Sequence, residues 1–250
     1  MKNNNININQ AVIFAGGEGT RLRPITNNIP KPLAPIDGRP FLDYLFKSLE
    51  DIGISKILML VGYQYEKIID KYGNKLSNGI TVDYSIGTIK DETGRRLLNA
   101  YPKLDNHFLL MYGDNYWHID LVNMLELYNK SKKEMLTTVF SNSQGTGEYG
   151  FGNNIEVGSD GIVKCYDKSG RAEGLNGVDI GYFLVCKRDL PIKIKDNISF
   201  ESVIFSSLID QKKVVGYVTE NQYYFITNKE SLCNFEGFAK TNKINPIDNF

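Results

Sequence analysis

Residues 12–24 read Val12-Ile13-Phe14-Ala15-Gly16-Gly17-Glu18-Gly19-Thr20-Arg21-Leu22-Arg23-Pro24, and residues 30–33 read Pro30-Lys31-Pro32-Leu33. An apolar segment here runs into a glycine-rich loop, and a lysine follows Arg21 by ten residues. Glycines let backbone N–H groups approach an anion because no Cβ stands in the way. An arginine grips phosphate oxygens in pairs, and a lysine adds a point charge. The stretch therefore predicts a site for nucleotide phosphates at the end of a buried strand.

The spacing of the glycines separates this loop from two other phosphate-binding loops. The pattern GxxxxGK[ST] is absent, and the dinucleotide pattern GxGxxG lacks its third glycine, since only Gly16, Gly17 and Gly19 are present. A structural turn without a ligand is the alternative interpretation. The longer string GGxGTRLxP, followed by PKPLxPI, resembles the signature of the sugar-1-phosphate nucleotidylyltransferase family.

This resemblance extends over roughly residues 10–240. It is strongest to heptose- and mannose-1-phosphate guanylyltransferases and partial to glucose-1-phosphate cytidylyltransferases. It implies a Rossmann-like nucleotidyltransferase fold, Mg²⁺ as cofactor, and an NTP (GTP or CTP) and a sugar 1-phosphate as substrates. The implied products are pyrophosphate and a nucleotide-activated sugar for surface polysaccharide.

Composition limits the other classes of function. The 250 residues suit one large α/β domain, and 29 Lys+Arg balance 29 Asp+Glu, which argues against nucleic-acid and anionic-membrane partners. No apolar run is long enough to span a membrane and no hydrophobic signal region opens the chain, so a cytoplasmic location is expected. The three cysteines are scattered and are expected to be reduced thiols in or near the core. Whether the chain forms a homo-oligomer stays open.

Strand and helix patterns alternate along the first part of the chain. Apolar runs predict strands, and three- and four-residue spacing or terminal glycines predict helices. The predicted strands are residues 11–15, 56–62, 81–85, 108–112 and 135–141. The predicted helices are residues 41–53, 65–72, 93–101 and 119–130. This order predicts the α/β class with a Rossmann-like, doubly wound mixed sheet, whose ligands bind at the carboxyl ends of strands.

A β-rich acceptor-binding lobe is predicted after residue 141. Its expected elements are strands at 153–157, 162–167 and 180–186, a helix at 200–209, a hairpin of 214–219 with 223–226, and a final helix at 229–240. The predicted organisation is a single nucleotidyltransferase domain with a nucleotide-binding half and an acceptor-binding half, between a flexible lead-in and a tail. The boundaries are residues 1–10, 11–141, 142–240 and 241–250.

The nucleotide side has three groups of candidate residues. Arg21 and Lys31 are the candidate catalytic cations. Backbone and polar contacts to the nucleotide are expected from Ala15, Gly16, Gly17, Gly19, Thr20, Thr93 and Gly94. Asp114 follows a buried strand, and the resemblance implies that it is catalytic and binds Mg²⁺, although a Gly-Asp pair also marks an ordinary turn. Thr93 also suits a helix cap, and at least one of Arg95 and Arg96 is expected on a solvated helix face. Trp117 is expected either to line the pocket or to pack in the core.

The candidate acceptor residues follow later in the chain. Glu148-Tyr149-Gly150 resembles a family segment that touches the sugar through backbone, which implicates Gly150. Tyr166-Asp167-Lys168 resembles the segment (F/Y)xEK, in which the acid contacts sugar hydroxyls and the lysine contacts phosphate. Asp179 stands where the family has an asparagine, and a carboxylate accepts hydrogen bonds but does not donate as an amide does.

One position departs from the family pattern. A second acidic metal ligand is expected in a segment W-x-D-I-G-T-P-E, but Phe225 stands at that place in Tyr223-Tyr224-Phe225-Ile226-Thr227. A phenyl ring does not ligate Mg²⁺. Two alternatives therefore stay open beside the sugar nucleotidylyltransferase. One is a nucleotidyltransferase that acts on a non-sugar phosphate or a phosphonate, and the other is a degenerate homologue that binds nucleotide or sugar phosphate without turnover.

Overall fold

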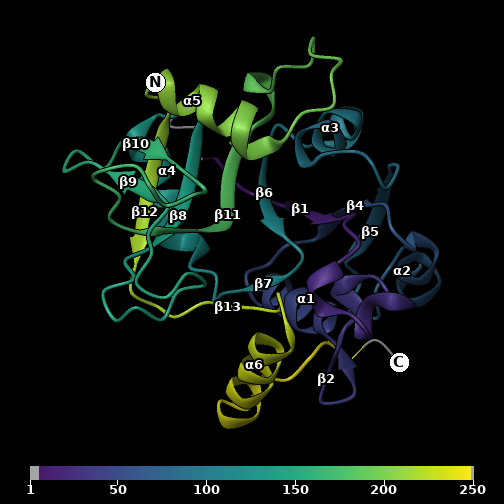
Figure 1. Cartoon of the computed structure of the whole chain (residues 1–250). Helices are drawn as coiled ribbons and strands as arrows, with labels where there is room; N and C mark the ends of the chain where they lie inside the picture. The colour runs from purple at the N-terminus through teal and green to yellow at the C-terminus, as the bar shows by residue number, and fades with distance from the viewer. Residues whose placement is uncertain (1–5, 249–250) are drawn as a thin grey trace. The chain divides into compact units, whose positions relative to one another are not determined.

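The buried apolar segments form a mixed seven-stranded sheet in the computed structural model, which describes residues 6–248. Its strands are β1 (Gln10–Ala15), β4 (Lys56–Val61), β5 (Thr81–Ile86), β6 (His107–Tyr112), β8 (Met135–Phe140), β11 (Val178–Cys186) and β12 (Val214–Thr219). Their order is β12-β8-β11-β6-β1-β4-β5 (Figure 1). β1, β4 and β5 pair in parallel, whereas β11 runs antiparallel to β8. The predicted α/β class with a mixed sheet is confirmed.

Residue contacts divide the chain into two units, each of which draws on separate stretches of sequence. Within the described residues, the phosphate-loop unit contains residues 9–91, 111–119 and 224–248. The β-rich unit contains residues 6–8, 92–110 and 120–223. Residues 1–5 of the predicted lead-in and 249–250 of the predicted tail lie outside the described residues. The predicted boundaries at 10, 141 and 240 stay predictions.

The phosphate-loop unit packs helices around an aromatic cluster. Its further elements are β2 (Pro35–Ile36), β3 (Arg39–Pro40), α1 (Phe41–Asp51), α2 (Tyr65–Tyr72), β7 (Asn115–Tyr116), β13 (Tyr224–Phe225) and α6 (Lys229–Thr241). α6 begins with a capping box between Asn228 and Ser231 and lies beside β2 and β13 (Figure 1). Its Phe235 ring lies 5.0 Å from the rings of both Phe41 and Tyr116. Burial of this apolar face holds the last helix to α1 and β7.

The β-rich unit contains the remaining elements. They are α3 (Thr93–Asn99), α4 (Leu121–Ser131), β9 (Ile155–Val157), β10 (Val163–Tyr166) and α5 (Ser206–Asp210). The predicted helix at 200–209 is present, but it opens with a π-helical turn at Phe200–Phe205, which Ser199 caps. The rings of Phe183, Phe200 and Phe205 contact one another in the core of the β-rich unit.

The predicted hairpin of residues 214–219 with 223–226 is wrong. β12 instead pairs in parallel with β8 over six residues, and β13 pairs antiparallel with β7. The three residues between the two strands suggested a tight turn, but Val214 and Val215 are fully or almost fully buried. The long apolar ladder with β8 buries these side chains in a way that a two-stranded hairpin does not.

The cysteines are free, as expected for reduced thiols, but only two of them fit the expected location. Cys186 is buried and Cys165 is partly exposed, whereas Cys233 is exposed on α6. The expectation that all three lie in or near the core is therefore wrong for Cys233.

Asp43→Ala is predicted to destabilise the protein by about 3 kcal/mol, because it leaves buried partners without their anion. Asp43 is fully buried, and its carboxylate accepts from Arg39 Nε at 3.1 Å and from the Tyr72 hydroxyl at 2.6 Å. Asp51→Ala on the same helix removes an exposed ion pair and should cost less than about 1 kcal/mol. Urea unfolding measures both free energies, and equal values would contradict the role of Asp43.

Candidate active site

The glycine-rich loop begins where β1 ends and is fixed by its own hydrogen bonds. Ala15 and Gly16 are buried, and Gly17 is exposed. Gly19 has a φ of +63°, which favours glycine, and starts a 3₁₀ turn at Thr20–Leu22. Its carbonyl accepts from Leu22 N at 2.9 Å and from Thr26 Oγ1 at 2.7 Å. The loop therefore presents the exposed Thr20 and Arg21 from a braced turn.

Gly19 also determines where Lys31 lies. A Cβ on Gly19 would stand 2.9 Å from Lys31 Cβ, so the aliphatic stem of the lysine packs directly against the glycine. Lys31 itself opens a 3₁₀ turn, Lys31–Leu33, between two prolines. The fixed φ of the prolines and the bond from Ala34 N to Lys31 O, at 3.0 Å, limit the freedom of this segment.

Asp114 approaches the same place from the end of β6. Gly113 N donates to Phe14 O at 2.9 Å, and a Cβ on Gly113 would stand 2.8 Å from that oxygen. Only glycine permits this approach, which brings Asp114 beside the end of β1. Lys31 Nζ lies 2.5 Å from Asp114 Oδ2, and the two side chains are 12% and 31% exposed. The structure thus brings Gly19, Lys31 and Asp114 together.

Phe225 lies next to Asp114, as the family pattern implies for the position that it occupies. β13 pairs Phe225 with Asn115, and Ile226 N donates to Asp114 O at 3.0 Å. No group of three or more His, Cys, Asp or Glu side chains that could hold a metal occurs within residues 6–248. Asp114 therefore belongs to no larger cluster of such ligands, and its carboxylate fits Mg²⁺ only if phosphate oxygens and water complete most of the coordination.

Trp117 packs in the core. Its side chain is fully buried three residues after Asp114, so of the two expectations for this residue the packing role is the one observed.

Gly150 lies in a loop of the β-rich unit whose centre is Asn142. The Asn142 amide nitrogen donates to the carbonyls of Gly150 and Gly152 at 2.7 and 3.0 Å, and its oxygen accepts from Gly147 N at 3.0 Å. Gly150 N donates to Gly147 O at 2.9 Å. No motif singled out Asn142, since its partners, which are backbone groups and the Asn153 side chain, are brought together only by the folded loop.

Asp167 organises its own turn. Its carboxylate accepts from the backbone N–H groups of Ser169, Arg171 and Ala172 and from the Ser169 hydroxyl, all at 2.7–2.9 Å. These hydrogen bonds lower the pKa of Asp167 to about 2. The neighbouring Lys168 is exposed. The predicted contact of Asp167 with an acceptor hydroxyl stays a prediction, and it would share the carboxylate with this turn.

Asp179 is the second residue of β11, and its carboxyl group accepts fewer hydrogen bonds than that of Asp167. Its Oδ1 accepts from Thr137 Oγ1 at 2.7 Å and from Gly181 N at 3.4 Å. Burial raises the pKa of Asp179 to about 7; the hydrogen bonds oppose this rise, and the charge of Glu201 adds to it. The neutral form of this carboxyl group is therefore favoured well above the pH at which an ordinary aspartate ionises.

Thr93 is tied to Glu201, a residue that the sequence reasoning missed. Thr93 Oγ1 donates to Glu201 Oε2 at 3.0 Å and accepts from Phe200 N at 2.8 Å. Ser199 Oγ donates to the same carboxylate oxygen at 2.7 Å, and Glu201 is 9% exposed. A buried acid beside a predicted site residue is a functional candidate. The segment Ser199-Phe200-Glu201 carried no signal that could be read without these partners.

The neighbours of Thr93 have packing roles. A Cβ on Gly94 would stand 2.8 Å from Ile198 O, so this glycine permits close packing of α3. A solvated position is wrong for Arg96, which is 6% exposed. Arg95 is partly exposed, and it donates to the carbonyl of Ile194 at 3.0 Å and to that of Asp196. Tertiary packing here overrides the polar appearance of the helix.

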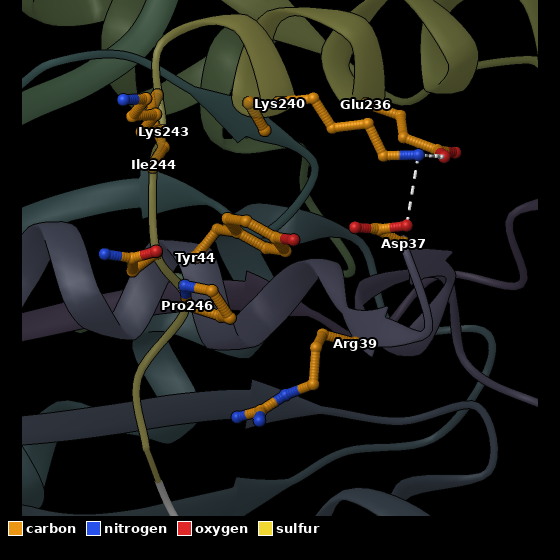
Figure 2. A pocket seen from close by; sticks show the side chains of 10 residues that line it. Asp37, Arg39, Tyr44, Glu236, Lys240, Lys243, Ile244 and Pro246 are labelled. Atoms are coloured by element: carbon orange, nitrogen blue, oxygen red, sulfur yellow. Dashed lines mark hydrogen bonds and ion pairs between the residues drawn. The ribbon is translucent and has the colours of Figure 1, made fainter.

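A separate open hollow of about 430 Å³ lies in the phosphate-loop unit (Figure 2). It is lined by β2–β3 turn residues, by α6 and by the segment that follows α6. Figure 2 shows Lys240 between Glu236 and Asp37, at 2.7 and 3.0 Å from their carboxylates.

The predicted site residues fall into two groups. Ala15, Gly16, Gly17, Gly19, Thr20, Arg21, Lys31 and Asp114 belong to the phosphate-loop unit. Thr93, Gly94, Gly150, Asp167, Lys168 and Asp179 belong to the β-rich unit. None of the helices among residues 6–248 combines the length and apolar character needed to cross a membrane.

Comparisons with known proteins agree with this architecture. The model of the nucleotidyl transferase family matches residues 10–184. D-glycero-alpha-D-manno-heptose 1-phosphate guanylyltransferase from Aneurinibacillus thermoaerophilus is 30% identical over 220 residues, 87% of this chain and 91% of that protein. A probable glucose-1-phosphate cytidylyltransferase from Bacillus subtilis is 29% identical over 230 residues, 83% of this chain and 87% of that protein.

Solved structures share the fold. HddC from Yersinia pseudotuberculosis, complexed with GMP-PN, has a TM-score of 0.74 at 24% identity over 91% of this chain and 97% of that chain. A putative glucose-1-phosphate thymidylyltransferase from Bacillus anthracis has a TM-score of 0.80 at 16% identity, over 92% of this chain and 95% of that chain.

Gly19→Ala is predicted to displace Lys31 and to lower turnover of an NTP about a hundredfold, since small misplacements of reacting groups have effects of that size. Gly38→Ala is the matched control, because Gly38 also has positive φ (+78°) but has no atom within 4 Å of the added Cβ. Both variants carry backbone strain, but only in Gly19→Ala does the added methyl group clash with Lys31. Equal turnover in the two would contradict the packing role of Gly19.

Asp179 is predicted to make the protein less stable as the pH rises from about 4 to about 7. Its folded-state pKa lies above the ordinary 3.8, so in this window the folded protein holds a proton that the unfolded chain has lost. Its stabilising contribution is complete below about pH 4 and is lost as the pH passes through about 7.

Asp179→Asn should remove this slope, which urea unfolding at several pH values measures. Asp167→Asn is the control: both its folded and unfolded pKa values lie below about 4, so its effect should be constant in the window. If the wild-type and Asp179→Asn curves run parallel, the protonation of Asp179 is refuted.

Proposed function

This chain belongs to the nucleotidyl transferase family, and on that premise we propose that it transfers a nucleotidyl group from an NTP to a sugar 1-phosphate. The reaction releases pyrophosphate and forms a nucleotide-activated sugar. GTP or CTP is the proposed NTP, since the relatives at 30% and 29% identity are named as a guanylyltransferase and a cytidylyltransferase. The product is proposed to supply surface polysaccharide synthesis.

The observation that supports this function best is the convergence of Gly19, Lys31 and Asp114. Lys31 Nζ is held against the glycine loop and faces Asp114 at 2.5 Å. Arg21 stands on the turn that Gly19 opens. Backbone N–H groups, two cations and a carboxylate in one loop region suit a triphosphate.

The proposed chemistry needs alignment and charge neutralisation more than proton transfer. An acceptor phosphate already carries anionic oxygens, so no general base is required for its attack on the α-phosphorus. In this proposal the glycine loop holds the triphosphate in line, and Arg21 and Lys31 neutralise charge that develops on the phosphate oxygens. Asp114 would hold Mg²⁺ together with phosphate oxygens, and that ion would supply further neutralisation.

The acceptor is proposed to contact Gly150, Asp167, Lys168 and Asp179. Asp179 also favours a second candidate, a nucleotidyltransferase that acts on a non-sugar phosphate or phosphonate. The reason is that this carboxyl group replaces an amide and titrates near neutral pH. A homologue that binds without turnover is the outcome that the assay below would support if every substrate failed.

Pyrophosphate release tests the proposal. The purified protein is incubated with each of the four NTPs and a panel of sugar 1-phosphates, with amino-alcohol phosphates and phosphonates as the comparison panel. We expect turnover with GTP or CTP and a sugar 1-phosphate. Turnover only with the comparison panel would show that the acceptor is a non-sugar phosphate or a phosphonate. Absence of turnover with both panels would refute the enzymatic function.

Arg21→Ala is predicted to lower kcat/KM by some tens- to a thousandfold, because losing a charge-assisted phosphate contact in the transition state costs roughly 2–4 kcal/mol. Arg188→Ala is the matched control, since its side chain is 82% exposed and pairs with the neighbouring Asp189. Circular dichroism checks that both variants fold. Wild-type kcat/KM in Arg21→Ala would remove Arg21 from the phosphate site.

A further inference from the structure

The carboxylate proposed to bind the metal already has a cation. Lys31 Nζ lies 2.5 Å from Asp114 Oδ2, a distance at which the ammonium occupies the place of an ion on that oxygen. Phe225, which does not ligate a metal, occupies the neighbouring position, and no group of three or more acidic, histidine or cysteine side chains that could hold a metal occurs within residues 6–248. A divalent cation that approached Asp114 in the free protein would therefore meet a carboxylate that is already paired with an ammonium.

We propose that Lys31 is a movable counter-ion, which closes Asp114 to divalent cations until a triphosphate draws its ammonium away. The nucleotide then withdraws the ammonium from Asp114 and also supplies the phosphate oxygens that complete the coordination of the metal. This inference rests on the proposed function for the identity of the anion, but not for the closure of Asp114 in the free protein. It assigns the chain an order of binding in which the metal enters with or after the NTP.

The geometry allows the lysine head to move while its base stays fixed. Gly19 packs against Lys31 Cβ and Cγ, and Pro30 and Pro32 flank the residue, so the backbone and the first side-chain carbons are held. The ammonium lies at the far end of the side chain, on Asp114 Oδ2. Because the glycine loop lies against the lysine stem, a triphosphate on the loop would lie within reach of the ammonium.

The backbone that carries Asp114 is held on both sides. Gly113 N donates to Phe14 O, and Asp114 O accepts from Ile226 N. The main chain at Asp114 therefore stays beside the end of β1 when the ammonium leaves. The short aspartate side chain can then bind the metal from that fixed backbone position.

Mn²⁺ titration of the nucleotide-free protein tests the closure. Free Mn²⁺ is measured by electron paramagnetic resonance. Quenching of Trp117, the single tryptophan, which lies three residues after Asp114, shows that the ion binds nearby. Lys31→Met removes the charge and keeps the stem, so we expect its Mn²⁺ affinity at this position to rise at least about fivefold over wild type, from loss of a unit charge.

Three variants control the titration. Lys31→Arg keeps a cation and should stay as weak as wild type. Lys164→Met removes a lysine that pairs with Asp160 at 2.7 Å elsewhere, and it should not change the Trp117 signal. The double variant Lys31→Met with Asp114→Asn should lose the gain. If Lys31→Met does not fold, Lys31→Gln carries the same expectation.

An unchanged Mn²⁺ affinity in folded Lys31→Met overturns the proposal, as does a gain that survives in the double variant. A second measurement separates this result from failure of the proposed function. GTP and CTP are titrated calorimetrically in EDTA, where Lys31→Met should bind at least about fivefold more weakly than wild type. Absence of NTP binding by the wild type would refute the function, while the Mn²⁺ result would still decide the counter-ion role.

Discussion

The hydrogen bond from Gly113 N to Phe14 O is the contact on which the candidate site depends. It joins the end of β1 to the residue before Asp114, and a side chain at Gly113 would meet the Phe14 carbonyl at 2.8 Å. The glycine loop leaves β1 at the next residue, so the same contact fixes the loop and the carboxylate against each other. Lys31 completes the group because Gly19 leaves room for its stem. Two glycines therefore set the geometry of the charged residues.

The sequence predicted the parts of the structure that depend on local patterns. Continuous apolar runs such as β4 and β6 and the spacing of Phe41, Leu45 and Leu49 in α1 reflect burial along one element, which a pattern records. The loop with Gly19, Arg21 and Lys31 could be predicted for the same reason. Its function needs residue types in a fixed order, and that order stands in consecutive positions of the chain.

What the sequence did not reveal depends on partners that are distant along the chain. β12 pairs with β8 and not with β13, because pairing with β8 buries Val214 and Val215. This burial outweighs the short connection between β12 and β13, which had suggested a hairpin. Asn142 and Glu201 acquire their roles only through loops that close around them. Arg96 looked solvated on its helix, yet packing buries it. The hydrogen bonds that the Asp167 carboxylate accepts within its own turn were likewise not predicted, and its contact with an acceptor stays a prediction.

The central claim is that the glycine loop and Lys31 hold the phosphates of a nucleotide beside Asp114, which is the proposed metal ligand. A crystal structure with a non-hydrolysable GTP or CTP analogue and Mg²⁺ tests it most directly. The account predicts a triphosphate against residues 16–20, with Lys31 Nζ on a phosphate oxygen and away from Asp114 Oδ2. A nucleotide bound elsewhere, with the ion pair of 2.5 Å intact, would contradict it.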